Sequence, residues 1–167
     1  MRNAIFAALT LSLSSFYLNA QSNTGLSFLK IGPGARAQAL GSAYTALSDD
    51  AASLYWNPAG LGLIKRNEVL AMHGEWLLGS SLDYVGVAIA RGKRPTGSLA
   101  ISLISLTQPE MEGRDDTGRK TGSFKARDMA LSLGWGMPLG SQAQGGLGLK
   151  LIDSRIGQDR AQGWALD

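Results

Sequence analysis

Cysteine is absent from the 167 residues, and histidine occurs only once, at position 73. Without cysteine the chain has no disulfide, no thiolate nucleophile and no cysteine-ligated zinc site. The sequence also contains no G-x-S-x-G, H-E-x-x-H or P-loop pattern, and its single histidine, His73, could not serve both a Ser-His-Asp triad and a metal site. We therefore expect a protein that is not an enzyme and that needs neither a cofactor nor a metal.

Charge is scarce as well. Asp, Glu, Lys and Arg make up 17% of the chain, against roughly 25% in a typical soluble domain. The formal net charge is only +3, and the basic residues are scattered rather than gathered into a stripe, so nucleic acid is not an expected partner. Proline is sparse (5) whereas glycine is abundant (22), a composition that suits half-apolar β-strands.

Long apolar runs are missing outside the first twenty residues. There, Arg2 precedes an apolar run from Ala4 to Leu18, and Leu18 and Ala20 fit the small-residue positions before a cut at Gln21. This pattern predicts a secretory signal peptide over residues 1–20. The alternative, a transmembrane anchor, needs about 20 apolar residues, which this run does not reach.

Residues 21–66 form a segment rich in Ala and Gly, with a helix expected in its second half. Ser48 is a plausible N-cap, and Asp49 and Asp50 would lie in the first turn, where carboxylates complement the helix dipole. Pro58 disfavours the helical conformation for the residue before it, so the helix should end at about Trp56.

The stretch LYWNPAGLG, residues 54–62, therefore predicts a helix end followed by an exit loop. The Asn57–Pro58 bond stops the helix, and Gly60 and Gly62 provide the loop. We interpret this stretch as a joint between the N-terminal segment and the chain that follows.

From about residue 68 the apolar pattern changes to a period of two. Large apolar residues alternate with small or polar ones, which predicts strands near residues 69–77, 81–91, 98–108, 125–137 and 145–153, and a sixth beginning at about 163.

Strands of about ten residues that alternate in this way are typical of transmembrane β-barrels. The large side chains would face lipid, and the small ones, together with Asp128 and Lys150, would face the lumen. The alternative is a secreted soluble β-sandwich, in which the large side chains would point into a core. Strands in globular sheets usually have only 5–6 residues, so strand length favours the barrel.

Connection lengths support the same interpretation, because barrels pair short periplasmic turns with longer external loops. The connections 91–97 and 138–144 are short, whereas 109–123 is the longest and is charged. About six strands are too few for a closed barrel, which needs at least eight. We therefore expect residues 67–167 to be the N-terminal part of a longer barrel, with closure by oligomerisation as the alternative.

The sequence also resembles a known family, the PorV/PorQ-type relatives of the FadL outer-membrane transporters. The resemblance rests on Gly34-Ala35-Arg36-Ala37, on Gly41, on Asp49-Asp50-Ala51, on Tyr55-Trp56-Asn57-Pro58-Ala59-Gly60-Leu61 and on the strand sequence at 121–136. Gln38-Ala39-Leu40 departs from the Met- and Gly-rich residues common in the family.

The resemblance implies a FadL-like antiparallel β-barrel in a Gram-negative outer membrane, with residues 21–66 folded inside as a hatch. Asp49, Asp50, Trp56, Asn57, Pro58 and Gly60 would form the hatch and its joint, and Asn57 would hydrogen-bond to the lumen wall. The partners would be outer-membrane lipid and, for a PorV-type member, exported proteins and subunits of the type IX secretion complex. The alternative is FadL-type passive transport of hydrophobic small molecules.

The hexapeptide GPGARA, residues 32–37, matches the dinucleotide fingerprint G-x-G-x-x-A. That fingerprint needs a long buried strand before it and an acidic residue about 20 positions later. Here only a short apolar stretch precedes it and Asp49 comes too early, so we expect no dinucleotide site.

Overall fold

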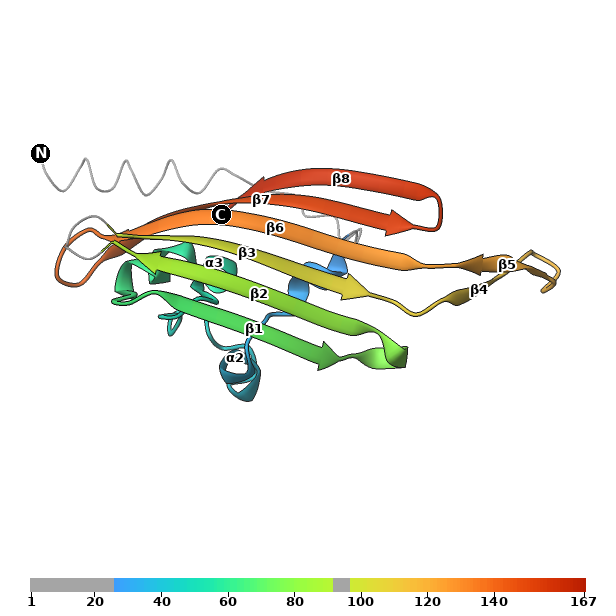
Figure 1. Cartoon of the computed structure of the whole chain (residues 1–167), viewed down its shortest axis with the longest axis horizontal. Helices are drawn as coiled ribbons and strands as arrows, with labels where there is room; N and C mark the ends of the chain where they lie inside the picture. The colour runs from blue at the N-terminus through green and yellow to red at the C-terminus, as the bar shows by residue number, and fades with distance from the viewer. Residues whose placement is uncertain (1–25, 92–96) are drawn as a thin grey trace, which may run out of the picture.

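The computed structural model describes residues 26–91 and 97–167, so the predicted signal peptide at 1–20 lies outside the described residues. Six antiparallel strands form one curved sheet in the order β1-β2-β3-β6-β7-β8 (Figure 1). Their bounds are β1 Glu68–Glu75, β2 Ser81–Ala90, β3 Ser98–Thr107, β6 Ala126–Pro138, β7 Gln144–Ile156 and β8 Asp159–Leu166. The predicted all-β antiparallel fold is confirmed, but the sheet is open, with β1 and β8 at its two edges.

The longest predicted loop, 109–123, is not a loop throughout. It continues as a second, two-stranded sheet, β4 Met111–Arg114 paired with β5 Lys120–Phe124. This hairpin projects beyond one end of the main sheet (Figure 1). We call that end of the strands the hairpin end. The prediction failed because the hairpin is polar except for Met111 and Phe124 at its base, so neither strand shows apolar alternation.

Strand β8 also differs from its prediction, because it begins at Asp159 rather than near residue 163. The expected polar loop at 154–162 is reduced to a tight turn between Ile156 and Asp159. Both strands continue through polar residues that had been assigned to the loop.

The N-terminal segment contains short helices only. They are η2 Ser27–Lys30, α2 Ala35–Ala39, α3 Ser53–Trp56 and η3 Pro58–Leu63, and a further turn, η4 Leu77–Gly79, joins β1 to β2. Helix α3 ends at Trp56 as predicted, but Ser48 is not its N-cap, because the helix begins only at Ser53. Within the described ranges, no helix is both long and apolar enough to cross a membrane.

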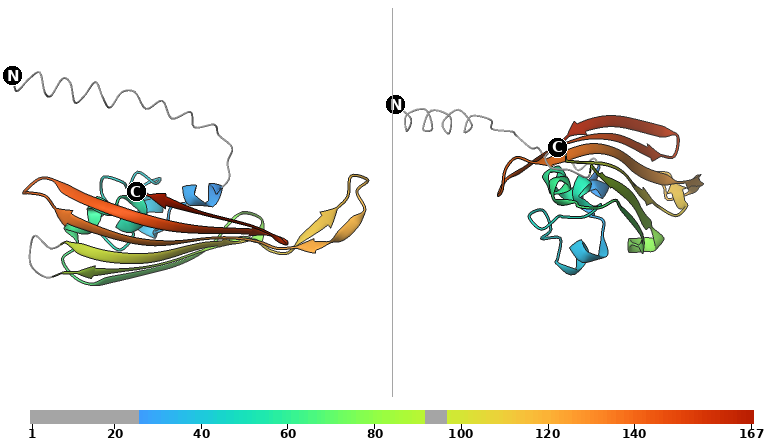
Figure 2. Two further views of the ribbon diagram at one scale, coloured as in Figure 1. Left: turned by 90° about the horizontal axis from the view of Figure 1, so that it is seen from above. Right: turned by 60° about the vertical axis from the view of Figure 1, so that its left-hand side comes forward.

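These short helices lie against one side of the sheet, in the hollow of its curve (Figure 2). We call this side the inner face and the opposite side the outer face. The joint segment η3 packs against β6 and β7 at the end opposite the hairpin, which we call the joint end.

The outer face carries a continuous group of exposed large apolar side chains, which we call the apolar band. Alternate residues of a strand point to opposite faces, so the strand register places these side chains together across all six strands. The exposed members of the band are Val69, Val85, Ile89, Ile101, Leu131, Leu133, Trp135, Leu147, Leu149, Leu151, Trp164 and Leu166.

The inner face changes character along the strands. Near the hairpin end Phe28 packs with large strand residues, including Leu82, Tyr84 and Ile104. Near the joint end small wall residues such as Ala88 and Ala100 make room for Leu54 and Leu61 of the N-terminal segment. The inner face is therefore shaped to hold this segment.

Candidate functional site

The joint of the N-terminal segment is seated on glycines of the inner face. A Cβ atom at Gly146 would lie 2.3 Å from the carbonyl carbon of Pro58, and one at Gly136 would lie 2.3 Å from the Pro58 carbonyl oxygen. Real Cβ atoms do not come so close, so only glycine lets the backbone of η3 approach β6 and β7 in this way. Pro58, which was predicted as part of the joint, lies at the centre of this contact.

Two leucines fill the seat. Leu54 and Leu61 have no exposed surface. A Cβ at Gly134 would lie 2.3 Å from Cδ1 of Leu54, and one at Gly136 would lie 2.8 Å from Cβ of Leu61. The glycines of β6 thus form hollows into which these two side chains fit.

Asp49 and Asp50, both predicted as site residues, belong to a hydrogen-bonded network inside the N-terminal segment. Arg36 Nη1 donates to Asp49 Oδ1 at 2.6 Å and to the Tyr44 hydroxyl at 3.0 Å. The Tyr44 hydroxyl in turn donates to Asp50 Oδ2 at 2.8 Å. Burial of the ring, together with the bond to Asp50, raises the pKa of Tyr44 to about 12.

The N-cap position of α3 is occupied by Ala52, and the turn before it is held by Asp50 rather than by Ser48. Its Oδ1 accepts from the Ala52 backbone N–H at 2.9 Å, and its own N–H donates to Ser53 Oγ at 3.2 Å. Ser48 is buried, and its hydroxyl donates back to the Thr45 carbonyl at 3.3 Å. The turn before α3 is therefore fixed by Asp50 and Ser53.

Trp56 connects this network to the glycine-rich loop at 32–37. Its Nε1–H donates to the Pro33 carbonyl at 3.0 Å. A Cβ at Gly32 would lie 2.0 Å from the indole ring, so Gly32 serves close packing of Trp56. Trp56 also meets the rings of Tyr44 and Tyr55 edge-on, at centroid distances of 6.0 and 5.2 Å.

In the described chain Asn57 makes its hydrogen bonds inside the N-terminal segment and not to the strands of the sheet. Asn57 Nδ2 donates to the Thr45 carbonyl at 3.1 Å, and Asn57 Oδ1 accepts from the Ala59 N–H at 3.1 Å. Both bonds stay within the N-terminal segment. Asn57 shapes the joint, and the neighbouring Pro58–Ala59 backbone makes the wall contact.

The two residues expected to face the lumen, Asp128 and Lys150, both lie on the inner face. Lys150 Nζ forms an ion pair with Asp167 Oδ2 at 2.9 Å and lies 5.8 Å from the centre of the Tyr55 ring. The Lys150 side chain is only 12% exposed. Asp128 Oδ1 accepts from Ser154 Oγ at 2.5 Å on the neighbouring strand. Lys150 therefore touches the N-terminal segment, whereas Asp128 bonds within the wall.

Tyr55 bonds to the first part of the N-terminal segment, in η2. Its hydroxyl donates to the Leu29 carbonyl at 2.6 Å. Burial, with a smaller effect of the nearby Asp167 carboxylate, raises the pKa of Tyr55 to about 12.

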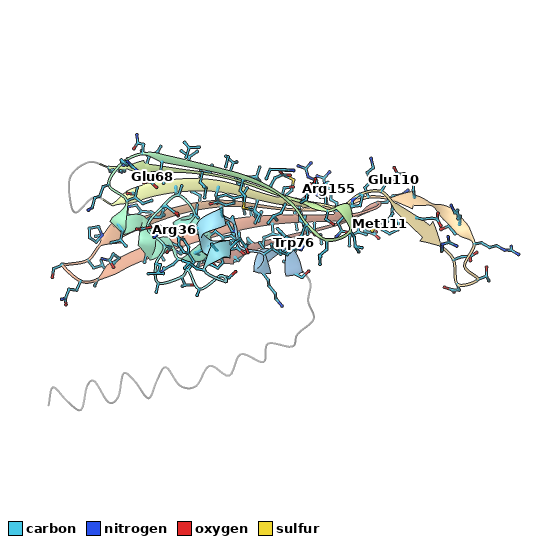
Figure 3. All side chains as sticks on the ribbon, turned by 90° about the horizontal axis from the view of Figure 1, so that it is seen from below. Arg36, Glu68, Trp76, Glu110, Met111 and Arg155 are labelled. Carbon is cyan, nitrogen blue, oxygen red and sulfur yellow. The ribbon has the colours of Figure 1, made fainter. Side chains whose placement is uncertain are left out.

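An apolar groove opens at the hairpin end between η2 and the β1–β2 connection, and its volume is about 330 Å³. Trp76, Leu77 and Leu78 line one side, and Leu77 and Leu78 are 74% and 94% exposed. Phe28 and Met111 line the other parts. Figure 3 shows Trp76 and Met111 at the same end of the molecule.

A polar groove of about 720 Å³ lies at the joint end, where Arg36 and Glu68 are found (Figure 3). Arg36, Asp49 and Asp50 contribute from the N-terminal segment, and Arg66 and Glu68 from the start of β1. The two grooves thus lie at opposite ends of the segment and differ in polarity.

In the part of the chain that the structure describes, His, Asp and Glu side chains nowhere gather in a group of three able to hold a metal ion. His73 Nδ1 lies 2.6 Å from Asp83 Oδ1 on the neighbouring strand, in an exposed cross-strand pair.

Several residues of the network and of the seat had not been predicted from the sequence. They are Tyr44 in the network and the wall glycines Gly134, Gly136 and Gly146. A signal for the glycines was present, because they fall at every second position of their strands, on the face that avoids large side chains. Tyr44 has no comparable signal.

The fold and the seat together define a curved antiparallel sheet whose hollow holds its own N-terminal segment. The chain belongs to the uncharacterised protein family UPF0164, whose family model matches residues 6–133. Neither the curated proteins nor the solved structures include a match to the chain.

Proposed function

We propose that the sheet is part of an outer-membrane β-barrel in which the N-terminal segment is the hatch. The single observation that carries the proposal is the apolar band. A soluble β-sandwich would bury such side chains in its core, whereas here twelve large apolar side chains stand exposed on the outer face. The hollow on the other side is filled by the chain itself.

The dimensions of the band fit a bilayer. On β6 the apolar outward residues run from Met129 to Met137, eight residues apart, or about 27 Å along the strand. A strand tilted by about 40° would then cross roughly 20 Å, close to the apolar band of about 25 Å on known barrels. Towards the hairpin end the outward side chains become polar, beginning with Asp83, Ser105 and Asp153 on β2, β3 and β7 and, one row later, with Arg127 on β6.

Two substitutions on the outer face of β3 test the membrane assignment. Ile101→Arg places a charge in the middle of the band and should cost about 2–4 kcal/mol, whereas Thr107→Arg lies beyond the band and should cost about 0–1 kcal/mol. The measurement is the urea unfolding midpoint of each full-length variant in lipid vesicles, together with its recovery in washed outer membranes. Recovery of the parent chain in the soluble fraction, with equal midpoints for both variants, would refute the proposal.

For the cargo, we propose first that the protein binds exported proteins and hands them on, as PorV-type components of type IX secretion do. The support is the sequence resemblance together with the projecting β4–β5 hairpin. The hairpin carries a surface charge pattern in which Glu112 pairs with both Arg114 and Lys120. Capture of exported proteins through their C-terminal domains by the full chain, lost when the hairpin is replaced by a short turn, would support this function.

The second candidate is passive uptake of hydrophobic small molecules, and the apolar groove at the hairpin end favours it. A saturable decrease in Trp76 fluorescence on addition of a long-chain fatty acid would indicate binding there. Leu77→Glu, which places a carboxylate in the groove, should abolish the signal. Leu139→Glu is the matched control, because Leu139 is similarly exposed, at 64%, but lies at the joint end. Equal binding by both variants would exclude the groove.

A further inference from the structure

Three arginines lie side by side on the outer face, in one row across the last three strands. The register pairs Arg127 of β6 with Arg155 of β7, and Arg155 with Arg160 of β8. We call these residues the arginine row. Arg155 lies at the hairpin end in Figure 3.

The arginine row borders the apolar band. Along β7, Arg155 is four residues from Leu151, on the same face, and along β8, Arg160 is four residues from Trp164. Leu151 and Trp164 are themselves cross-strand partners and are both exposed. On β7 and β8 the row therefore lies four residues from the last apolar row, and Asp153 and Gln162 occupy the single row between them.

The contacts of the row hold the guanidinium groups at this boundary without neutralising them. Asp153 accepts from Arg155 Nε at 2.9 Å and from Arg160 Nε at 2.5 Å, and Ser105 Oγ accepts from Arg127 Nε at 3.3 Å. Three cations and one carboxylate leave a net charge of +2. In the described chain these bonds all use Nε, so the Nη groups remain available to a ligand.

A second observation is the composition of the same row on the first three strands. There the cross-strand partners are Glu75, Ser81 and Thr107, which carry no positive charge. The positive charge is therefore confined to one side of the sheet, over β6, β7 and β8.

From this placement we propose that the arginine row binds the phosphate of lipid headgroups in the leaflet at the hairpin end. Guanidinium groups bind phosphate oxygens through paired N–H donors, and a row at the edge of an apolar band holds them at headgroup depth. The inference rests on the proposed membrane location of the sheet. It adds a lipid-binding site on the outer face, separate from any cargo path on the inner face.

Trp164 provides the test, because it lies on the same face as the row and only four residues from Arg160. The full chain is reconstituted in phosphatidylcholine vesicles that contain either brominated phosphatidylglycerol or brominated phosphatidylcholine, since bromine quenches nearby tryptophan. Subtracting the fluorescence of the Trp164→Phe variant from that of the parent chain isolates the Trp164 signal. Phosphatidylglycerol should quench at a concentration on the order of three- to tenfold lower than phosphatidylcholine.

The triple variant Arg127→Gln, Arg155→Gln, Arg160→Gln should lose this preference, so that the two lipids quench equally. The matched control is Arg114→Gln, Arg119→Gln, Lys120→Gln in the β4–β5 hairpin. It removes the same charge from the same end of the molecule, but away from the band, and should keep the preference.

Each contrary result has a distinct meaning. Equal quenching of the parent chain by both lipids would overturn the arginine site and leave the membrane location intact. No quenching by either lipid would overturn the membrane location and the site with it. Loss of the preference when inorganic phosphate replaces chloride at equal ionic strength would show a site for free phosphate instead of a lipid site. Loss of the preference in the control variant would show a general charge effect and overturn the site as well.

Discussion

Residue 146 is a glycine, and the absence of a side chain at this position lets the backbone of Pro58 approach β7 closely. At the joint, the contact between the segment and β6 and β7 depends on such glycine positions. Asn57, the most polar residue of the joint, bonds only to its own segment, and the contact with β6 and β7 is backbone against glycine.

Gly146→Ala should therefore release the joint. The added Cβ would fall 2.3 Å from a backbone atom that has no alternative position, and overpacking of this kind costs about 1–3 kcal/mol. The measurement is hydrogen exchange of residues 48–64 in the full chain. Gly163→Ala is the control, since Gly163 has no atom within 4 Å of an added Cβ. It should leave exchange unchanged, and equal exchange in the two variants would show that the seat is not tightly packed.

Tyr44 should make the stability of the N-terminal segment fall as the pH rises into the alkaline range. Its folded pKa of about 12 lies above the ordinary value of 10.0, so folding favours the neutral phenol. The resulting stabilisation is complete below pH 10 and is lost as the pH rises through about 12. Tyr44→Phe removes this contribution and, at neutral pH, costs about 0.5–1.5 kcal/mol through the lost bond to Asp50.

The measurement is the urea midpoint of both proteins between about pH 9 and pH 11. The parent protein should lose stability more steeply than the variant. Tyr55 and Tyr84 are present in both, so the difference reports on Tyr44. Parallel curves would contradict the assigned role of its hydroxyl.

At the scale of the elements, the proposed barrel places the hairpin end and the joint end on opposite sides of the membrane. A protease recognition sequence inserted between Gly118 and Arg119, at the tip of the hairpin, should be cleaved when protease is added to intact cells. The same insertion between Gly140 and Ser141, in the turn after β6, should be cleaved only after the outer membrane is opened. If only the insertion between Gly140 and Ser141 were cleaved in intact cells, the joint end would be the external one and the proposal of an external hairpin would be refuted.

The strands were predictable where they cross the apolar band and not beyond it. Alternation located the core of β2, β3, β6 and β7, because there every second side chain is large and apolar. Beyond the band the outward residues are polar, as with Arg155 and Arg160, so β7 and β8 were each predicted too short. The same reason hid β4 and β5, which lack apolar alternation altogether.

The N-terminal segment was less predictable because its contacts are long-range or depend on exact side-chain choice. The helix end at Trp56 followed from Pro58, a local effect. The start of α3 did not, because the packed structure buries Ser48 and the helix begins only at Ser53. The joint function of residues 57–60 was expected, but its glycine partners on β6 and β7 lie more than 70 residues further along the chain.

For the whole molecule, the proposed barrel requires that the outer edge of β8 be paired with another strand. Asp167 exchanges both backbone hydrogen bonds with Gly148, so in this register the N–H groups of Gln162 and Trp164 point to the free edge, whereas that of Ala161 points to β7. Ala161→Pro should destabilise the sheet in any case. Gln162→Pro should do so only if the edge is paired in the membrane.

The measurement is the urea midpoint of each variant in vesicles, with Gln162→Ala as the control for the lost side-chain bond to Asp153. A paired edge predicts a loss for Gln162→Pro comparable to that for Ala161→Pro. A midpoint equal to that of Gln162→Ala would mean that the edge of β8 remains free, and a membrane barrel closed at this edge would be excluded.

The glycine seat also sets an order of events during folding. Residues 54–63 leave the ribosome before the strands β6 and β7 that receive them, so the first part of the described chain to be made cannot dock until much later residues have paired. Contacts of such long sequence separation form slowly. Until then Leu54 and Leu61 stay uncovered, so along the proposed export route the chain would carry an exposed apolar stretch near its N-terminus until β6 and β7 have paired.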